Sequence, residues 1–146
     1  MHQLTGGCAC GNFSVRLTLT KPPQDYTARQ CGCSFCVSHG GTHISDPLGL
    51  FEVSVADESL WNKYRFGTGT CDFLICTKCD GYLGAVGDTP TGFRGVIDIR
   101  CLDGSEVITA RTPSDFEGES VEDRLARRGR NWTPASLKVG GRKIGP

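Results

Sequence analysis

Apolar and polar residues alternate along much of the chain. Between residues 12 and 20 every second side chain is apolar, namely Phe13, Val15, Leu17 and Leu19, which is typical of a strand with one buried face. Other segments rich in β-branched and aromatic residues are separated by Gly, Pro, Asp and Asn, which favour turns. They predict further strands over residues 26–29, 51–55, 64–66, 73–75, 82–86, 95–102 and 106–110. The chain is therefore predicted to be mostly β.

The second half of the chain holds two more local signals. The pair Asp103-Gly104 lies between two predicted strands and is a strong hairpin signal. Ser120 with Asp123 three residues later resembles a capping box at the start of a helix, and Gly129 is a residue at which that helix would end. A short, peripheral helix is predicted between Ser120 and Gly129.

Composition bounds the number of domains and the kinds of partner. The chain has 146 residues, of which 38% are hydrophobic and 22% charged. This suits one globular domain over residues 1–146, with residues 114–146 as a peripheral tail. Sixteen Lys and Arg residues balance sixteen Asp and Glu residues, so no net basic field attracts a nucleic acid or an acidic membrane. We expect neither as a partner.

The apolar runs bear on the location of the protein. The first seven residues lack the charged-then-apolar pattern of a secretory signal. No run approaches the roughly 20 apolar residues that a membrane span needs. We therefore expect a cytoplasmic protein.

Nine cysteines are the most informative feature of the composition. A reducing cytoplasm does not sustain structural disulfides, so the thiols need another role. Cys71 and Cys101 stand apart and are expected to be small buried side chains. The other seven have the spacing of metal ligands and form the groups Cys8-x-Cys10, Cys31-x-Cys33-x-x-Cys36 and Cys76-x-x-Cys79.

Two of these groups supply the ligands of one closed site. A tetrahedral structural zinc site takes two pairs of thiolates, with Zn–S distances of about 2.3 Å. One ion bound there ties the start of the chain to its middle and closes a long loop. Soft thiolates favour Zn²⁺ over Mg²⁺ or Ca²⁺, although an iron–sulfur cluster uses the same ligands. The predicted ligands are Cys8, Cys10, Cys76 and Cys79.

The third group predicts an open site. Cys31, Cys33 and Cys36 supply three thiolates, which leaves one coordination place for water or a substrate sulfur. An open place distinguishes a catalytic metal from a structural one. Because the three ligands are soft, a thiol substrate is expected to bind at the open coordination place.

A side chain from elsewhere in the chain is the alternative fourth ligand. His39 lies three residues after Cys36 and would complete a Cys₃His site. His43, Cys71 or Cys101 would do the same from a neighbouring loop or strand. Against ligation, we expect His39 in a polar pocket wall or at the surface, and His43 at the surface.

The order of the three cysteine groups resembles a known family. The segments Gly7-Cys8-Ala9-Cys10-Gly11, Cys31-Gly32-Cys33-Ser34-Phe35-Cys36 and Cys76-Thr77-Lys78-Cys79 are similar to those of the glutathione-dependent formaldehyde-activating enzymes, also called centromere protein V-like. The resemblance implies a fold of mostly antiparallel sheets, similar to the Mss4-like β-tent, and two zinc ions per chain. It implies a structural zinc on Cys8, Cys10, Cys76 and Cys79 and a catalytic zinc on Cys31, Cys33 and Cys36.

The same resemblance implies carbon–sulfur lyase activity. The founding reaction joins glutathione to formaldehyde and gives S-hydroxymethylglutathione. Two positions depart from the family pattern: Val37 replaces a basic residue that often follows the central group, and Asp80 stands between Cys79 and Gly81. Formaldehyde as the substrate therefore does not follow from the resemblance. Asp80 would be either a hydrogen-bond acceptor beside the structural metal or a turn residue, and we favour the turn.

Two functional hypotheses follow from these observations. The first is a zinc-dependent carbon–sulfur lyase whose small-molecule partner is glutathione or a similar thiol. The second is a noncatalytic module in which zinc holds a β fold together and the surface binds another protein.

Overall fold

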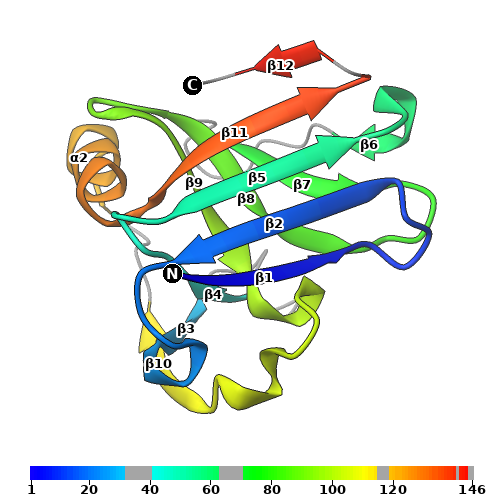
Figure 1. Cartoon of the computed structure of the whole chain (residues 1–146). Helices are drawn as coiled ribbons and strands as arrows, with labels where there is room; N and C mark the ends of the chain where they lie inside the picture. The colour runs from blue at the N-terminus through cyan, green and yellow to red at the C-terminus, as the bar shows by residue number, and fades with distance from the viewer. Residues whose placement is uncertain (32–40, 63–70, 115–118, 141, 145–146) are drawn as a thin grey trace.

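The computed structural model describes residues 1–31, 41–62, 71–114, 119–140 and 142–144. Within these ranges the chain is mostly β with one α-helix, as the sequence predicts (Figure 1). The strands are β1 (His2–Gly7), β2 (Phe13–Leu19), β3 (Thr27–Cys31), β4 (Thr42–Ile44), β5 (Leu50–Val55), β6 (Trp61–Asn62), β7 (Asp72–Cys76), β8 (Tyr82–Thr89), β9 (Gly92–Asp98), β10 (Ala110–Ser114), β11 (Thr133–Val139) and β12 (Arg142–Ile144). The helix is α2 (Val121–Asn131), and four short 3₁₀ turns are η1 (Pro23–Asp25), η2 (Glu58–Leu60), η3 (Ile99–Cys101) and η4 (Ser105–Val107).

β2 shows how the alternating pattern becomes structure. Its residues Phe13, Val15, Leu17 and Leu19 are at most 4% exposed, and the residues between them face outward. The strand pairs antiparallel with β1 on one side and β5 on the other. The period of two thus places one whole face of β2 in the core.

The strands form one sheet in the order β1-β2-β5-β11-β9-β4-β3-β10, and β8, β7 and β6 extend from β9. Most neighbours are antiparallel, but β5 pairs parallel with β11 and β3 pairs parallel with β10. Parallel partners need long connections, and here most of the chain separates each pair. The alternation of a single strand carries no information on such distant partners.

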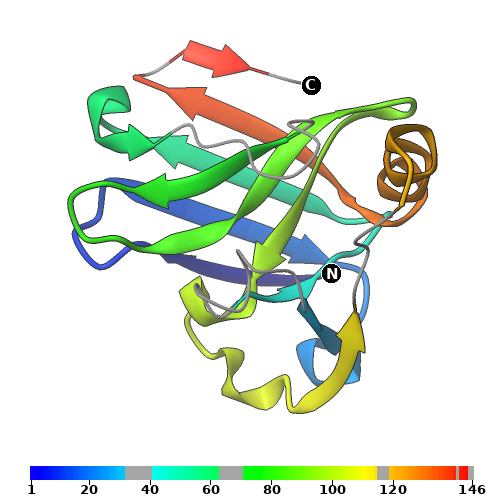
Figure 2. The same ribbon diagram turned by 180° about the vertical axis from the view of Figure 1, so that it is seen from behind.

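The sheet curls over on itself. β1, β2, β5 and β11 form one layer in Figure 1, and β7, β8 and β9 form the opposite layer in Figure 2; β11 joins them by pairing with β9. Phe13, Phe51, Leu74 and Ile97 fill the space between the layers and are at most 1% exposed. Gly84 permits close packing within this curl, because it has a φ of 140° and a Cβ there would lie 2.1 Å from the Val96 carbonyl oxygen.

The prediction of a hairpin at Asp103-Gly104 is wrong. β9 already ends at Asp98, whose carboxylate accepts a hydrogen bond from the backbone N–H of Arg100 and caps η3. Gly104 does take a left-handed conformation with a φ of 78°, but it leads into η4. The next strand, β10, then pairs with β3. The cap at Asp98 thus diverts the chain before a hairpin forms.

The predicted helix is present, with a later end. The Ser120 hydroxyl accepts the backbone N–H of Asp123 at 3.1 Å, which is the predicted cap. The helix passes Gly129 and ends at Asn131. Gly129 allows close packing, because a Cβ at this position would lie 3.2 Å from the Thr91 hydroxyl oxygen. The Thr91 hydroxyl donates a hydrogen bond to the Gly129 carbonyl at 2.7 Å.

The expectation that residues 114–146 form a peripheral tail is wrong for β11. This strand lies inside the sheet between β5 and β9. Ala135, Leu137 and Val139 are at most 3% exposed. The segment alternates apolar and polar residues as β2 does, and the core needs it to connect its two layers.

Candidate metal centre

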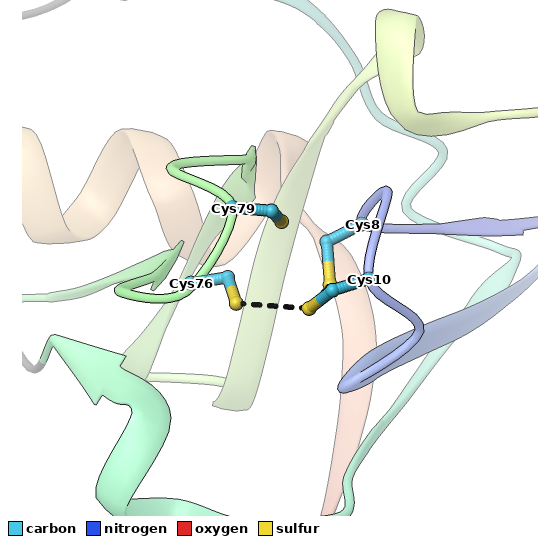
Figure 3. A group of neighbouring side chains, drawn as sticks. All are labelled: Cys8, Cys10, Cys76 and Cys79. Atoms are coloured by element: carbon cyan, nitrogen blue, oxygen red, sulfur yellow. Dashed lines mark hydrogen bonds between the residues drawn. The ribbon is translucent and has the colours of Figure 1, made fainter.

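Four cysteines from two distant segments meet at one end of the sheet. Cys8 and Cys10 lie in the connection from β1 to β2, whereas Cys76 ends β7 and Cys79 lies in the turn to β8 (Figure 3). All four sulfurs lie within 4.8 Å of one another. The Sγ atoms of Cys10 and Cys76 are 3.5 Å apart, and those of Cys8 and Cys10 are 3.6 Å apart. The predicted closed ligand set is therefore brought together.

Local backbone structure explains how each pair is presented. In the first connection Gly11 has a φ of 83°, and its N–H donates to the Cys8 carbonyl at 3.0 Å. In the second, Asp80 has a φ of 60°, and its N–H donates to the Cys76 carbonyl at 2.8 Å. Asp tolerates this left-handed conformation better than most side chains. The prediction of Asp80 as a turn residue is confirmed.

The spacing of the sulfurs fits a tetrahedral metal ion. Four thiolates at about 2.3 Å from a central zinc lie about 3.8 Å from one another, close to the two sulfur pairs above. Cys76 is fully buried, Cys8 and Cys79 are half-buried, and Cys10 is exposed. The backbone N–H of Phe13 also donates to the Cys8 sulfur at 3.3 Å, a bond that favours the charged thiolate. These four residues are a candidate metal centre.

The thiols of the cluster differ in acidity. The backbone N–H of Cys10, assisted by that of Gly81, lowers the pKa of the Cys79 thiol to about 6 despite partial desolvation. The backbone N–H of Asn12 lowers the pKa of Cys10, but desolvation and the three neighbouring sulfurs outweigh it and raise the value to about 11. Crowded sulfurs resist sharing several negative charges. A bound cation removes this repulsion, so ion binding and ionisation of the thiols are coupled.

Most of the predicted open site lies outside the described part of the chain. Cys33, Cys36 and His39 lie outside the described residues, and of Cys31 only the backbone at the end of β3 is described. Cys71 is 3% exposed, which confirms the expectation of a small buried side chain. Cys101 is partly buried, and desolvation raises the pKa of its thiol to about 12.

The expectation that His43 lies at the surface is wrong. Its side chain is 7% exposed, and its Nε2 lies 2.7 Å from the hydroxyl oxygen of Tyr82. Desolvation, followed by the positive charges of Arg29 and Arg100, lowers the pKa of His43 to about 3. The imidazole is therefore neutral at physiological pH. Because β4 has only three residues, the sequence carried no periodic signal for this burial.

A cavity of about 390 Å³ lies beside the cysteine centre. Residues 7–9, 80–83 and 100–101 line it, so its walls come from both cysteine-bearing turns and from η3. Arg100 is held in this wall by an ion pair with Asp98, whose side chain is fully buried. The Arg100 Nη2 and the Asp98 Oδ2 are 2.8 Å apart. The Asp98 hydrogen bond also raises the pKa of Arg100. No spacing signal in the sequence marks Tyr82, Arg100 or Asp98, because each is a single polar residue at or just beyond the end of a strand.

Fold and site together define a mostly β protein with a four-cysteine candidate metal centre. A scan against family models and a search of curated proteins found no match to the sequence. A crystal structure of a Rhodobacter sphaeroides protein from structural genomics is similar, with a TM-score of 0.57 and 23% sequence identity; the match covers 75% of this chain and 99% of that one. This likeness concerns the fold. Among the described residues, no helix has both the length and the apolar character needed to cross a membrane.

Proposed function

We propose that this protein is a zinc-dependent carbon–sulfur lyase acting on an adduct of glutathione or a similar thiol. One zinc ion, on Cys8, Cys10, Cys76 and Cys79, would be structural. A second, on Cys31, Cys33 and Cys36, would be catalytic. This is the division of roles implied by the resemblance to glutathione-dependent formaldehyde-activating enzymes.

One observation carries this proposal. The four-cysteine cluster is complete by itself, with every sulfur within 4.8 Å of the others. Four thiolates fill a tetrahedral site, so the three closely spaced cysteines Cys31, Cys33 and Cys36 of the sequence would be available for a separate purpose. Four ligands are typical of structural zinc, and three protein ligands are typical of catalytic zinc.

The strand pairings support a site near the end of β3. Gln30 pairs with Thr42, and His43 pairs with Asp98, which leads into η3. The backbone of Cys31 therefore ends β3 on the side of the sheet where β9 ends and η3 begins. Two residues of η3, Arg100 and Cys101, line the cavity described above.

The proposed reaction has a simple balance of atoms. A zinc ion would supply a coordination place that favours the thiolate form of the substrate sulfur. In the direction of condensation the thiol loses its proton, the sulfur pair forms a bond to a carbonyl carbon, and the carbonyl oxygen takes up a proton. In the lyase direction the carbon–sulfur bond breaks, the sulfur retains the bonding pair, and the hydroxyl proton is lost.

Three variants test this division of roles. Cys33→Ser is expected to keep the fold and one zinc ion while activity falls to background. Cys76→Ser is expected to lose the fold together with the metal. Cys71→Ala, which alters a thiol outside the four-cysteine cluster, is the control and is expected to keep two zinc ions and full activity. Metal analysis, far-UV circular dichroism and turnover of S-hydroxymethylglutathione measure these properties.

The outcome that contradicts the proposal is equally concrete. If Cys33→Ser and Cys76→Ser unfold the chain alike, and the wild type turns over no thiol adduct, then both metals are structural. That result would favour the zinc-scaffolded interaction module.

A further inference from the structure

Tyr82 and His43 form a buried pair at the wall of the cavity. Tyr82 begins β8 and His43 lies in β4, two strands that are separated by β9 in the sheet. The Tyr82 hydroxyl and the His43 Nε2 are 2.7 Å apart, and the two rings meet edge to face with centroids 5.7 Å apart. Each side chain is 7% exposed. The pair is thus rigidly placed, and only Tyr82 belongs to the cavity wall described above.

The charges around this pair suit proton exchange at the phenol oxygen. Arg100 lines the same cavity, and Tyr82 contributes to the electrostatic stabilisation of its guanidinium. The cavity wall that contains Tyr82 therefore also contains a guanidinium group. The Arg100 side chain itself donates to both oxygens of the Asp98 carboxylate, at 3.3 Å to Oδ1 and at 3.2 and 2.8 Å to Oδ2. The neutral His43 supplies a hydrogen-bond partner without adding a further charge.

We propose that Tyr82, positioned by His43, exchanges a proton with the oxygen of a carbonyl or hydroxymethyl ligand bound in this cavity. The inference rests on the proposed lyase function and assigns its proton-transfer residue. Tyr82 would be the catalytic residue, because it touches the ligand oxygen. His43 would be a positioning residue, because it acts through Tyr82.

The step balances with no additional reactant. As the substrate sulfur forms its bond to the carbonyl carbon, the π pair moves onto oxygen, which takes the Tyr82 hydroxyl proton. The proton released from the substrate thiol then returns to the Tyr82 oxygen. The net change is one proton moved from sulfur to oxygen, and the lyase direction is the reverse.

Tyr26 provides a matched comparison within the chain. Its hydroxyl is also buried and also has a hydrogen-bond partner, the Asp46 carboxylate at 2.6 Å. Asp46 additionally accepts hydrogen bonds from Thr20, so this tyrosine belongs to a connection between chain segments. Removing either hydroxyl leaves the aromatic ring in place, so the two variants differ in position and not in chemistry.

The test compares Tyr82→Phe with Tyr26→Phe in the zinc-loaded protein, with S-hydroxymethylglutathione as the probe. Tyr82→Phe is expected to lower kcat by about 10²- to 10⁴-fold, the usual contribution of a general acid or base. Its KM and its zinc content are expected to stay near those of the wild type. Tyr26→Phe is expected to leave kcat unchanged.

A second pair of variants separates positioning from structure. His43→Leu removes the partner of the Tyr82 hydroxyl and is expected to lower kcat by about tenfold or more, within the range of general acid–base effects. His43→Gln offers a polar nitrogen or oxygen near the same place and is expected to recover part of kcat. KM should change little in either variant.

The outcomes separate this inference from the proposed function. If the wild type turns over the adduct and Tyr82→Phe keeps its kcat, the role of Tyr82 is overturned while the lyase function stands. If the wild type shows no turnover with two zinc ions bound, the lyase function and the role of Tyr82 fall together. An equal loss of kcat in His43→Leu and His43→Gln would overturn the positioning role of His43.

Discussion

The two ends of β2 are fixed to the rest of the molecule in different ways. At its start, Phe13 donates its N–H to the Cys8 sulfur, and Cys8 belongs to the four-cysteine cluster that reaches the β7–β8 turn. At its end, Thr20 donates both its N–H and its hydroxyl to the Asp46 carboxylate, at 2.9 and 2.6 Å. One end lies at a cluster of thiols that could bind a cation, and the other lies at a carboxylate whose oxygens already accept hydrogen bonds.

The group around Asp46 is a hydrogen-bonded hub. Its Oδ2 accepts the Tyr26 hydroxyl at 2.6 Å, and its Oδ1 accepts the backbone N–H of Leu48 at 2.9 Å. Its own backbone N–H donates to the hydroxyl of Thr133 at the start of β11. Thus the hub needs no ion to join β2, the β4–β5 connection and β11. The comparison teaches that this small sheet has one connection built from potential metal ligands and one built from hydrogen bonds to a carboxylate.

The largest expected effect follows from breaking the thiol end. Cys76→Ser, or extraction of the metal with a strong chelator, should unfold most of the chain. Structural zinc binds with about 10–16 kcal/mol in small domains, whereas a whole domain is stable by about 5–15 kcal/mol. Far-UV circular dichroism and metal content, measured on the same sample, check this expectation.

Cys101→Ser is the matched control for that experiment. Its thiol lies outside the cluster and donates only a long hydrogen bond, 3.8 Å, to the Leu83 carbonyl. It should keep the metal and the fold. A chelated wild type that retains its full circular dichroism spectrum would show that the cluster does not hold the fold together.

The sequence predicted the thiol end of β2 and missed the carboxylate end, for a physical reason. Few side chains bind soft metals, so the spacing of Cys8, Cys10, Cys76 and Cys79 is restrictive by itself. Asp46 precedes a proline and has the sequence context of an ordinary turn residue. Its donors come from segments that meet only after folding, so no local pattern marks them.

The same distinction applies to the fold. The period of two predicted β2, because burial of one face repeats within a single strand. It could not predict the parallel pairing of β11 with β5, which depends on how the sheet closes. Nor could it predict that His43 is buried against Tyr82, since the two residues are brought together by strands from different parts of the chain.

The next largest effect follows from breaking the carboxylate end. Asp46→Ala leaves the Thr20 N–H, the Tyr26 hydroxyl and the Leu48 N–H without their acceptor. A buried donor left unsatisfied costs about 1–3 kcal/mol. The Tyr26 hydroxyl is buried and the two N–H groups are part-buried, so we expect a loss of about 3 kcal/mol in the free energy of unfolding. Urea denaturation measures this loss. Metal content should stay at the wild-type level; its loss would show that the two ends of β2 are not independent.

A change of pH should change the stabilisation at the two ends of β2 over different pH ranges. The expected effect is smaller than that of Asp46→Ala. Desolvation raises the pKa of Asp46, but the hydrogen bonds from Thr20, Tyr26 and Leu48 outweigh it and bring the value to about 2, below its ordinary 3.8. Because the folded value is depressed, the stabilisation is complete above about pH 4 and is lost as the pH falls through 2, an effect of about 2 kcal/mol. Proton competition for the thiolates, by contrast, already weakens metal binding at milder acidity.

The measurement is urea denaturation of the wild type and Asp46→Asn between pH 8 and pH 5. The difference in unfolding free energy between the wild type and Asp46→Asn should be constant over this range, because Asp46 of the wild type stays ionised in both the folded and the unfolded state. The stability of both proteins should fall together as the thiolates lose metal. A difference that shrinks toward pH 5 would mean that the carboxylate titrates in this range, contrary to its hydrogen bonding.

The smallest effect is expected from Tyr26→Phe, which removes one donor and leaves the carboxylate in place. The remaining hydrogen bonds from Thr20 and Leu48 still satisfy Asp46, so no buried charge is left bare. A hydrogen bond to a charged group contributes about 1.5–3 kcal/mol, and we expect a loss near the lower end of that range. Urea denaturation at pH 7 should show it with an unchanged metal content. A loss as large as that of Asp46→Ala would mean that Tyr26, and not the carboxylate, holds this end of β2.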